Sequence, residues 1–339
     1  MRDRYEGQID IAKVAKTRHL PDMEIANEVK EIFDHMLGDG KSVIRPETTI
    51  WTISAAEELR SRIEDDPKEG KAFTQWEKLD EQLKGASDDV ILLAAELVFL
   101  REHPLRSSSP NTRRFHIERV LSHLQDPVEI PSQMESWLSR PRGKAGFTSG
   151  QGYNGRLWKH LIWTAIFIKH LQSLPDSDRE HLKSDAWAFQ KAMLDSGKDS
   201  TDIRYALQFL AHPDVFEPIA SHNLKERIRA GFLELIDETT TDNPAQIDED
   251  LLKIRASLAT EFTEPFHFWT PEVQKLWDPG VIETEPSSAS TSNSVTARDD
   301  SEPRPRHYWL YTPGEQASMW NKFAEAGIMA IAWDELGDF

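Results

Sequence analysis

A cluster of basic residues in the middle of the chain has the chemistry to bind phosphate. Between Glu135 and Asp176 the sequence contains no acidic residue, whereas arginine and lysine recur. Protein contacts to nucleic-acid phosphates draw on these two side chains. Because the whole chain carries a net charge of −18, the cluster should form a local positive surface. The predicted nucleic-acid-binding residues are Arg140, Arg142, Lys144, Arg156 and Lys159, with Lys169 further along the same segment.

Glycine is abundant in the middle of this basic segment. Residues 143–155 read GKAGFTSGQGYNG and include Phe147 and Tyr153. Backbone amides at glycines, flanking cations and aromatic faces are together the components of a phosphate or single-strand contact. Two other interpretations remain. The segment could be an ordinary loop whose charges balance an acidic body. It could also be a surface that docks on an acidic face of this or another subunit.

Residues for covalent or metal chemistry do not form a recognisable pattern. The chain has no cysteine, which removes disulfides, thiolate nucleophiles and cysteine-based metal sites. Residues 38–42 end in Gly-Lys-Ser, but His35 stands where a P-loop needs glycine. The twelve histidines show no zinc-binding spacing, so we expect no metal, no cofactor and no catalytic residue. An alternative is an enzyme whose site is assembled from distant residues, with His160 or His212 among them.

Aromatic residues are dense at the C-terminal end. Residues 307–339 read as a strand, a turn at Pro313-Gly314, an amphipathic helix and a second strand. Alternate strand residues point inward, so these aromatics could be core residues of a small domain.

This segment resembles the start of the EVE-like (PUA-like) module of McrB-type AAA+ restriction ATPases. The shared features are a Tyr-Trp start at Tyr308, the Pro-Gly turn, a Trp in the helix, and the stretch GIMAIAWDELGD over residues 327–338. Residues 216–221 and 264–268 are also similar to the N-terminal extension of such ATPases. The C-terminal match covers about a tenth of the chain, and no Walker or nuclease motif is present in it.

The resemblance also implies a pocket with aromatic walls that accepts a flipped base, and the base-pocket candidates are Trp309, Tyr311, Trp320 and Trp333. It further implies a function in phage defence. The chain would be a non-catalytic nucleic-acid recognition or regulatory part of a McrB-like restriction system for modified DNA, without the ATPase domain. Its partners would be DNA with modified bases and a nuclease subunit or AAA+ ATPase. The alternative is a protein–protein scaffold of a defence complex that makes no nucleic-acid contact.

Helices are the elements that must position these residues. Ser54, Ser132 and Ser177 are each followed three residues later by glutamate, the capping-box spacing that starts a helix. Residues 90–100 and 157–171 are apolar around most of a helical circumference, which predicts central helices. Residues 42–52 could form a hairpin or a loop. Helices are predicted over residues 21–37, 54–64, 72–84, 88–102, 112–124, 132–139, 155–173, 177–195, 201–211, 222–236 and 246–261.

The expected fold class is mainly α, with three regions along the chain. Residues 1–278 should form a multi-helical body. Residues 279–306 are rich in Ser, Thr and Pro and predict a disordered linker, because they hold too little apolar surface to fold. Residues 307–339 would be a short α+β fragment of a PUA-like barrel. A polar N-terminus and the lack of a long apolar stretch predict no signal peptide, no membrane contact and a cytoplasmic location.

Overall fold

The computed structural model describes most of the predicted helical body. The described residues are 9–65, 67, 73–147, 152–197, 200–236 and 243–279. All of them belong to one compact unit, Met1–Glu283. The predicted linker beyond residue 279 lies outside the described residues. So does the C-terminal segment with its base-pocket candidates, Trp309, Tyr311, Trp320 and Trp333.

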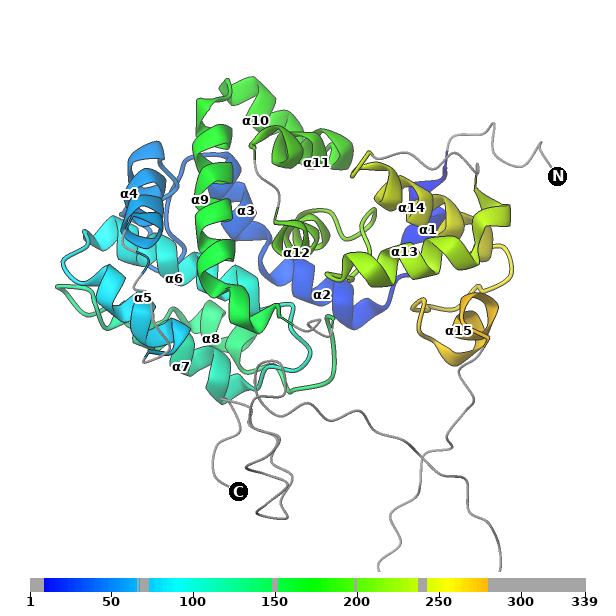
Figure 1. Ribbon diagram of the computed structural model, residues 1–339, viewed down its shortest axis with the longest axis horizontal. Helices are drawn as coiled ribbons and strands as arrows, with labels where there is room; N and C mark the ends of the chain where they lie inside the picture. The colour runs from blue at the N-terminus through cyan, green and yellow to red at the C-terminus, as the bar shows by residue number, and fades with distance from the viewer. Residues whose placement is uncertain are drawn as a thin grey trace, which may run out of the picture. The chain divides into compact units, whose positions relative to one another are not determined.

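The described part of the chain is built from helices, which confirms the predicted mainly α fold (Figure 1). The first half contains α1 (Ile11–Ala15), α2 (Leu20–Glu28), α3 (Lys30–Leu37), α4 (Ile53–Glu64), α5 (Gln75–Leu83), α6 (Asp88–Glu102), α7 (Pro110–Leu121) and α8 (Ser132–Leu138). The second half contains η2 (Asn154–Arg156), α9 (Leu157–Ser173), α10 (Asp176–Leu182), α11 (Ala186–Asp195), α12 (Thr201–Ala211), α13 (His222–Gly231), η3 (Leu233–Leu235), α14 (Gln246–Leu258) and α15 (Pro271–Trp277). None of these described helices combines the length and apolar composition needed to cross a membrane.

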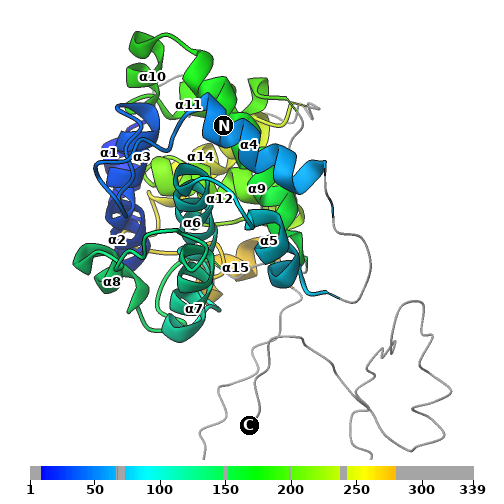
Figure 2. The ribbon, with the colours of Figure 1, turned by 90° about the vertical axis from the view of Figure 1, so that its left-hand side faces the viewer.

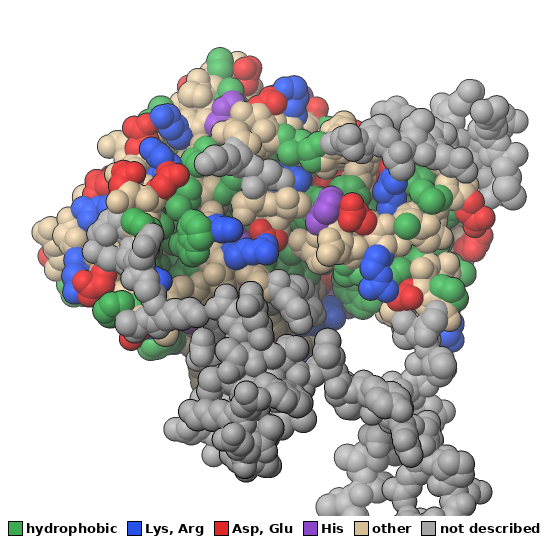
Figure 3. Space-filling view, in the orientation of Figure 1, with side chains coloured by type: hydrophobic (Ala, Val, Ile, Leu, Met, Phe, Trp, Pro, Cys, Tyr) green, Lys and Arg blue, Asp and Glu red, His purple; other side chains and the backbone are tan. Residues whose placement is uncertain are grey.

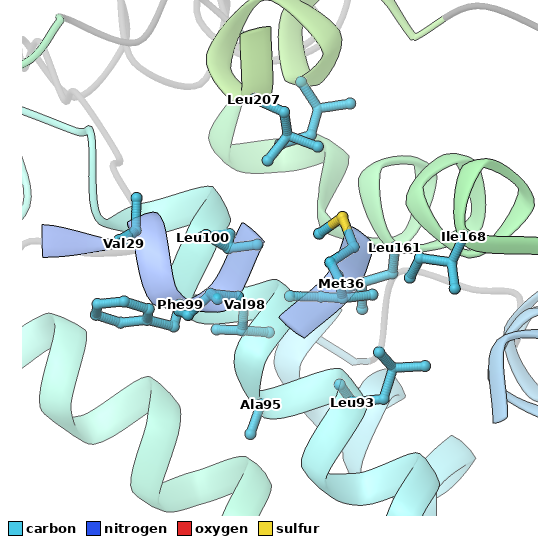
Figure 4. Close-up of a cluster of buried hydrophobic side chains, with 14 of the residues drawn as sticks. Val29, Met36, Leu93, Ala95, Val98, Phe99, Leu100, Leu161, Ile168 and Leu207 are labelled. Atoms are coloured by element: carbon cyan, nitrogen blue, oxygen red, sulfur yellow. The ribbon is translucent and has the colours of Figure 1, made fainter. Parts of the chain in front are cut away.

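Helix α6 is the centre of the main helical core, which is a large cluster of buried apolar side chains. Every residue of α6 from Val90 to Glu102 is buried, as its all-round apolar sequence predicts. Helices α4, α7, α9 and α12 pack around it, and Figure 2 shows α6 near the middle of the ribbon. In Figure 4, side chains of α6 lie close to Met36 of α3 and Leu161 of α9, and Leu207 of α12 belongs to the same buried cluster. The core therefore depends on contacts between segments far apart in sequence.

A second, smaller apolar cluster lies around α13, α14 and α15, and we call this part the C-terminal lobe. Its buried side chains include Ile228, Ile254 and Phe268. Helix α13 packs against both α14 and α15, and α1 contacts α14. Gly231 is required where α13 meets α15, because a Cβ atom there would fall 2.3 Å from the Cβ of Trp277. Close backbone approach thus fixes the α13–α15 packing.

Charged side chains are buried where the C-terminal lobe meets the main helical core. The Glu217 carboxylate accepts hydrogen bonds from Arg18 Nη1 at 2.6 Å and from Arg255 Nε and Nη2 at 2.7 and 2.9 Å. Nearby, Lys225 Nζ lies 2.5 Å from Asp248 Oδ1. All five side chains are nearly inaccessible. We call these two groups, Arg18–Glu217–Arg255 and Lys225–Asp248, the charged seam.

The segment 42–52 is a loop held against α6 and is not a hairpin of strands. A single bridge joins Lys41 to Thr49, and the described residues contain no regular strand. Glu96 of α6 holds the start of the loop, because its Oε1 accepts hydrogen bonds from Ser42 Oγ at 2.6 Å and from the Val43 amide at 2.7 Å. A buried carboxylate therefore takes the place of a sheet partner for these amides.

The helix start signals differ from the prediction by one or two residues. Helix α4 begins after Thr52, whose side chain accepts from the Ala55 amide, so Ser54 lies inside the helix. Ser132 and Ser177 also lie inside the first turns of α8 and α10, because a proline occupies each N-cap. The capping residue is set by where the chain turns into the helix, which the three-residue spacing alone does not fix.

Predicted helices 21–37 and 177–195 are each a pair of helices. Helices α2 and α3 are separated at Val29, which leaves the helical region of backbone angles. Helices α10 and α11 are separated by Asp185, whose carboxylate caps α11 by accepting from its first amides. Helices α1 and α15 were not predicted, and both are short, which leaves little periodicity to detect.

Candidate functional site

Arg140, the first residue of the predicted basic cluster, is directed into the protein. Its guanidinium donates to the His103 carbonyl and lies 3.5 Å from a carboxylate oxygen of Glu28. Only 12% of its side chain is exposed, and burial lowers its pKa to about 10. Arg140 therefore holds the loop after α8 in place and is not accessible to a phosphate group.

Arg142 and Lys144 are exposed on the turn that follows α8. The aromatic residues of the same glycine-rich segment are not exposed. Phe147 and Tyr153 are each 2% exposed and contact one another edge to face, with ring centres 6.1 Å apart. The expectation that these rings offer faces to a base is wrong, because both are part of the main helical core.

Arg156 and Lys159 lie at the start of α9, on the surface. Arg156 is half exposed, and its Nη1 lies 3.2 Å from Asp202 Oδ2. Lys159 is exposed beside Trp158, with its Nζ 5.2 Å from the centre of the indole ring. Lys169, near the other end of α9, forms an ion pair with Glu57. Arg156 and Lys159 thus lie together at the start of α9, whereas Lys169 lies near its other end.

A polar pocket of about 650 Å³ opens beside Arg156 and Lys159. The first residues of α12 and of α13 line it, including Thr201, Asp202 and His222. The first amides of a helix have no partner within the helix and carry partial positive charge, so a helix start favours an anion. Two helix starts, two cations and the Asp202 carboxylate therefore surround this pocket.

An apolar pocket of about 990 Å³ adjoins the polar one. Lys159 and Ser200 line both pockets. Trp158 is 49% exposed, whereas Trp163 is 3% exposed and its indole N–H has no hydrogen-bond partner among the described residues. In the space-filling view, Lys and Arg side chains lie beside hydrophobic side chains over the lower end of α9 (Figure 3). The other apolar side chains that line the pocket are Ile63, Pro67, Leu79, Leu157, Leu161, Ile162 and Ile166.

His160 fixes the carboxylate that forms one wall of the polar pocket. Its Nδ1 accepts a hydrogen bond from Arg101 Nε at 3.1 Å, and arginine can only donate. The ring proton is therefore on Nε2, which lies 3.2 Å from Asp202 Oδ2. Burial lowers the pKa of His160. Burial would raise the pKa of Asp202, but the contact with His160 and the charge of Arg156 outweigh it and hold that pKa below its ordinary range.

These contacts bear on the enzymatic alternative, which named His160 and His212. His160 is 1% exposed and its Nδ1 is bonded to Arg101, so the ring is not open to a substrate. His212 lies elsewhere, with its Nε2 3.0 Å from the Leu182 carbonyl. The structure thus gives His160 a positioning role beside the polar pocket, and the enzymatic alternative stays a prediction.

The sequence did not point to Trp158, Trp163 or the starts of α12 and α13. A Trp-Lys pair inside an apolar run, and Ser221 before α13, were the available signals. Each is common in ordinary helices. Residues 156–163, 200–202 and 221–223 come together around the pockets only when the chain folds, and no local sequence pattern shows this.

Comparison with known proteins adds no relative. No protein-family model, no curated protein and no solved structure matches this chain. The resemblance to McrB-type ATPases therefore stays a prediction that depends mainly on residues 307–339. The function is therefore inferred from the geometry of the two pockets.

Proposed function

We propose that the helical body is a non-catalytic nucleic-acid-recognition module that binds one nucleotide of an unpaired strand. The base would lie in the apolar pocket, against Trp158, and the phosphate in the polar pocket, at the starts of α12 and α13. The observation that carries the proposal is that Lys159 lines both pockets, so a cation stands between an aromatic surface and a polar one.

Magnitudes favour this division of the ligand. Stacking of a base on an aromatic side chain contributes about 1–3 kcal/mol. Phosphate binding at cations and helix starts adds a term that weakens with salt. Arg60, Glu64 and Lys78 also line the apolar pocket, and their side chains can pair with polar groups of a base. Affinity should therefore depend on both pockets and fall with added salt.

Within the wider function, we propose that this module belongs to a restriction system of the McrB type. Its nucleic acid would then be DNA with modified bases, and a nuclease subunit or an AAA+ ATPase would be its partner. The support is the resemblance of residues 307–339 together with a pocket that can take an unpaired base.

Fluorescence anisotropy with a labelled single-stranded oligonucleotide tests the nucleotide site. We expect binding at about 50 mM salt that weakens strongly by about 200 mM. Trp158→Ala and Lys159→Glu should each reduce affinity about tenfold or more, consistent with about 1–3 kcal/mol per contact. The matched control is Lys169→Glu, which changes a lysine on the same helix outside both pockets and should leave affinity within about twofold of wild type.

The result distinguishes binding at the two pockets from general attraction between opposite charges. Equal losses in Lys159→Glu, Lys169→Glu and Arg142→Glu would show charge attraction without a site. Absence of binding at low salt would overturn the proposal. Arg140 is left unchanged, because its substitution would break contacts inside the protein. Circular dichroism of each variant checks that the helices remain.

A scaffold function is the second candidate, and the apolar pocket is the observation that favours it. A large side chain from a partner protein would fill this pocket as well as a base would, and half-exposed Trp158 suits either contact. The two functions differ in the other pocket, because a scaffold has no need of the helix starts. Protein binding that Trp158→Ala abolishes and Lys159→Glu leaves intact, without any oligonucleotide binding, would support the scaffold.

A further inference from the structure

Two histidines and an aspartate meet where the start of α2 approaches the C-terminal lobe. His19 is the N-cap residue of α2, Asp22 lies in its first turn, and His267 comes from the segment between α14 and α15. Asp22 Oδ2 lies 3.4 Å from His19 Nδ1 and 3.5 Å from His267 Nε2. One ligand atom from each residue lies within 4.8 Å of the other two.

The polar atoms at the centre of this group lack hydrogen bonds. His19 Nδ1 and Asp22 Oδ2 are both buried, and neither has a hydrogen-bond partner among the described residues. Such atoms are costly in folded proteins, because their desolvation is not compensated. A single ion bound between them would satisfy both atoms. This observation is independent of the proximity of the three side chains.

The other oxygen of Asp22 is held in place by the backbone. Its Oδ1 accepts a hydrogen bond from the Gly146 amide at 2.7 Å. Only glycine fits there, because φ is +84° and a Cβ atom would fall 2.0 Å from the Pro104 carbonyl oxygen. Metal-binding carboxylates are commonly oriented by a hydrogen bond of this kind. Oδ2 is thereby left facing the two imidazoles.

The two distances from Asp22 match those between ligands of a small tetrahedral ion. With metal–ligand bonds of about 2.0–2.1 Å, neighbouring ligands of tetrahedral zinc lie about 3.3 Å apart. The observed 3.4 and 3.5 Å require almost no movement of Asp22 relative to either histidine. Two imidazoles and one carboxylate suit zinc and its neighbours, whereas calcium and magnesium need several oxygen ligands.

A positive charge lies close to the three side chains. Arg106 Cζ stands 5.8 Å from the ring centre of Trp269, which stacks on His267. This charge works against a cation, so affinity must come from the bonds to the three ligands.

We propose that His19, Asp22 and His267 form a binding site for one divalent transition-metal ion of the zinc class. The fourth position would hold water, because 34% of the His19 side chain is exposed. The ion would tie the main helical core to the C-terminal lobe. It would act beside the hydrogen bond from the Phe266 amide to the Thr17 carbonyl, which is 3.0 Å long. The site is separate from both pockets of the proposed function.

Titration of the full chain with Co²⁺ and Zn²⁺, after treatment with a chelator, tests this site. We expect one ion per chain, a visible absorption band typical of four-coordinate Co²⁺, and displacement of Co²⁺ by Zn²⁺. Zn²⁺ should raise the melting temperature, and Mg²⁺ or Ca²⁺ at the same concentration should not. A wild-type chain that is folded but binds no Co²⁺ with defined stoichiometry would overturn the proposal.

Variants show which side chains hold the ion. His267→Ala and His19→Ala should each weaken Zn²⁺ binding at least about 100-fold, since even partners outside the ligand set are worth about 10–100-fold. The matched control is His181→Ala, which removes a mostly exposed histidine paired with Asp185 and should bind as wild type does. Unchanged binding in both ligand variants would overturn the assignment. If His267→Ala does not fold, His19→Ala carries the test, because its ring is partly exposed.

Discussion

Two buried glutamates show how differently the main helical core and the charged seam are built. Glu96 of α6 is fully buried, and burial raises its pKa to about 7 despite the hydrogen bonds from Ser42 and the following amides. Glu217 is equally buried, but the charges of Arg18 and Arg255 outweigh the effect of burial and lower its pKa to about 2. The difference lies in the partners, because the uncharged donors around Glu96 do not outweigh desolvation, whereas the two arginines beside Glu217 do.

The contrast extends to how each region is stabilised. Around Glu96 the free energy comes from apolar burial, and the carboxyl group is a local cost that the loop contacts offset in part. In the charged seam, paired charges replace apolar contacts between the core and the C-terminal lobe. Buried ion pairs add little net stability over apolar residues, but removing one partner is costly. Substituting one partner of the charged seam should therefore cost more stability than replacing the whole set of charges with apolar residues.

The largest expected effect is loss of stability when Glu217 is changed. Glu217→Gln leaves Arg18 and Arg255 buried side by side without a counter-charge, which should cost about 3–5 kcal/mol of unfolding free energy. Urea denaturation measures it. Glu261→Gln, at an exposed position, is the control and should stay within about 0.5 kcal/mol of wild type. A loss below 1 kcal/mol for Glu217→Gln would contradict the seam's role.

A smaller effect on stability is expected at Glu96, and its pH dependence is opposite to that of Glu217. An unfolded chain releases this proton near its ordinary pKa of 4.5, whereas the folded protein holds it up to about 7, so stability falls as pH rises between these values. Glu96→Gln should remove this fall, worth about 3 kcal/mol at most. Glu217 has the other sign, because its stability is present above pH 4.5 and is lost as pH falls toward 2.

Denaturation of wild type, Glu96→Gln and Glu217→Gln at several pH values tests the two signs. The difference between each variant and wild type isolates one carboxyl group from all the others. If both difference curves slope the same way between pH 3 and pH 7, the comparison of the two glutamates is wrong.

The smallest effect is expected for an ion pair that is neither in the core nor in the seam. Lys30 Nζ lies 2.6 Å from Asp34 Oδ2 on the surface of α3, with 68% and 43% of the two side chains exposed. Lys30→Ala should change the unfolding free energy by less than about 0.5 kcal/mol, and less still at high salt. Thermal denaturation at two salt concentrations measures it. A cost near that of Glu217→Gln would mean that burial does not separate the two kinds of pair.

The part of the fold that follows from local pattern was predictable. The apolar run 90–100 predicted the central helix α6, because a helix that is apolar on all sides must be surrounded by other parts of the protein. The charged seam was not predictable, since Arg18 and Glu217 are 199 residues apart. Nothing in the neighbourhood of either residue distinguishes a buried charge from a solvated one. Fold-level packing decides it.

The candidate sites show the same limit. Arg156 and Lys159 were predicted, because clustered charge is visible in sequence, but their pocket partners come from α12 and α13. Arg140 belongs to the same run of charge and is buried, because Glu28 and the His103 carbonyl happen to face it. His19-x-x-Asp22 is a common spacing, and its third member, His267, lies near the far end of the described chain.

The pairing of Arg18 with Glu217 and Arg255 also constrains how the protein is made. Ribosomes add about 5–20 residues per second, so Arg18 is complete roughly 10–40 s before Glu217 exists. Arg255 follows later still. Throughout that interval Arg18, in the turn between α1 and α2, lacks its carboxylate partner, while α6 and its apolar neighbours can already collapse. Residues around Arg18 are thus synthesised well before the contacts that hold them in the folded protein.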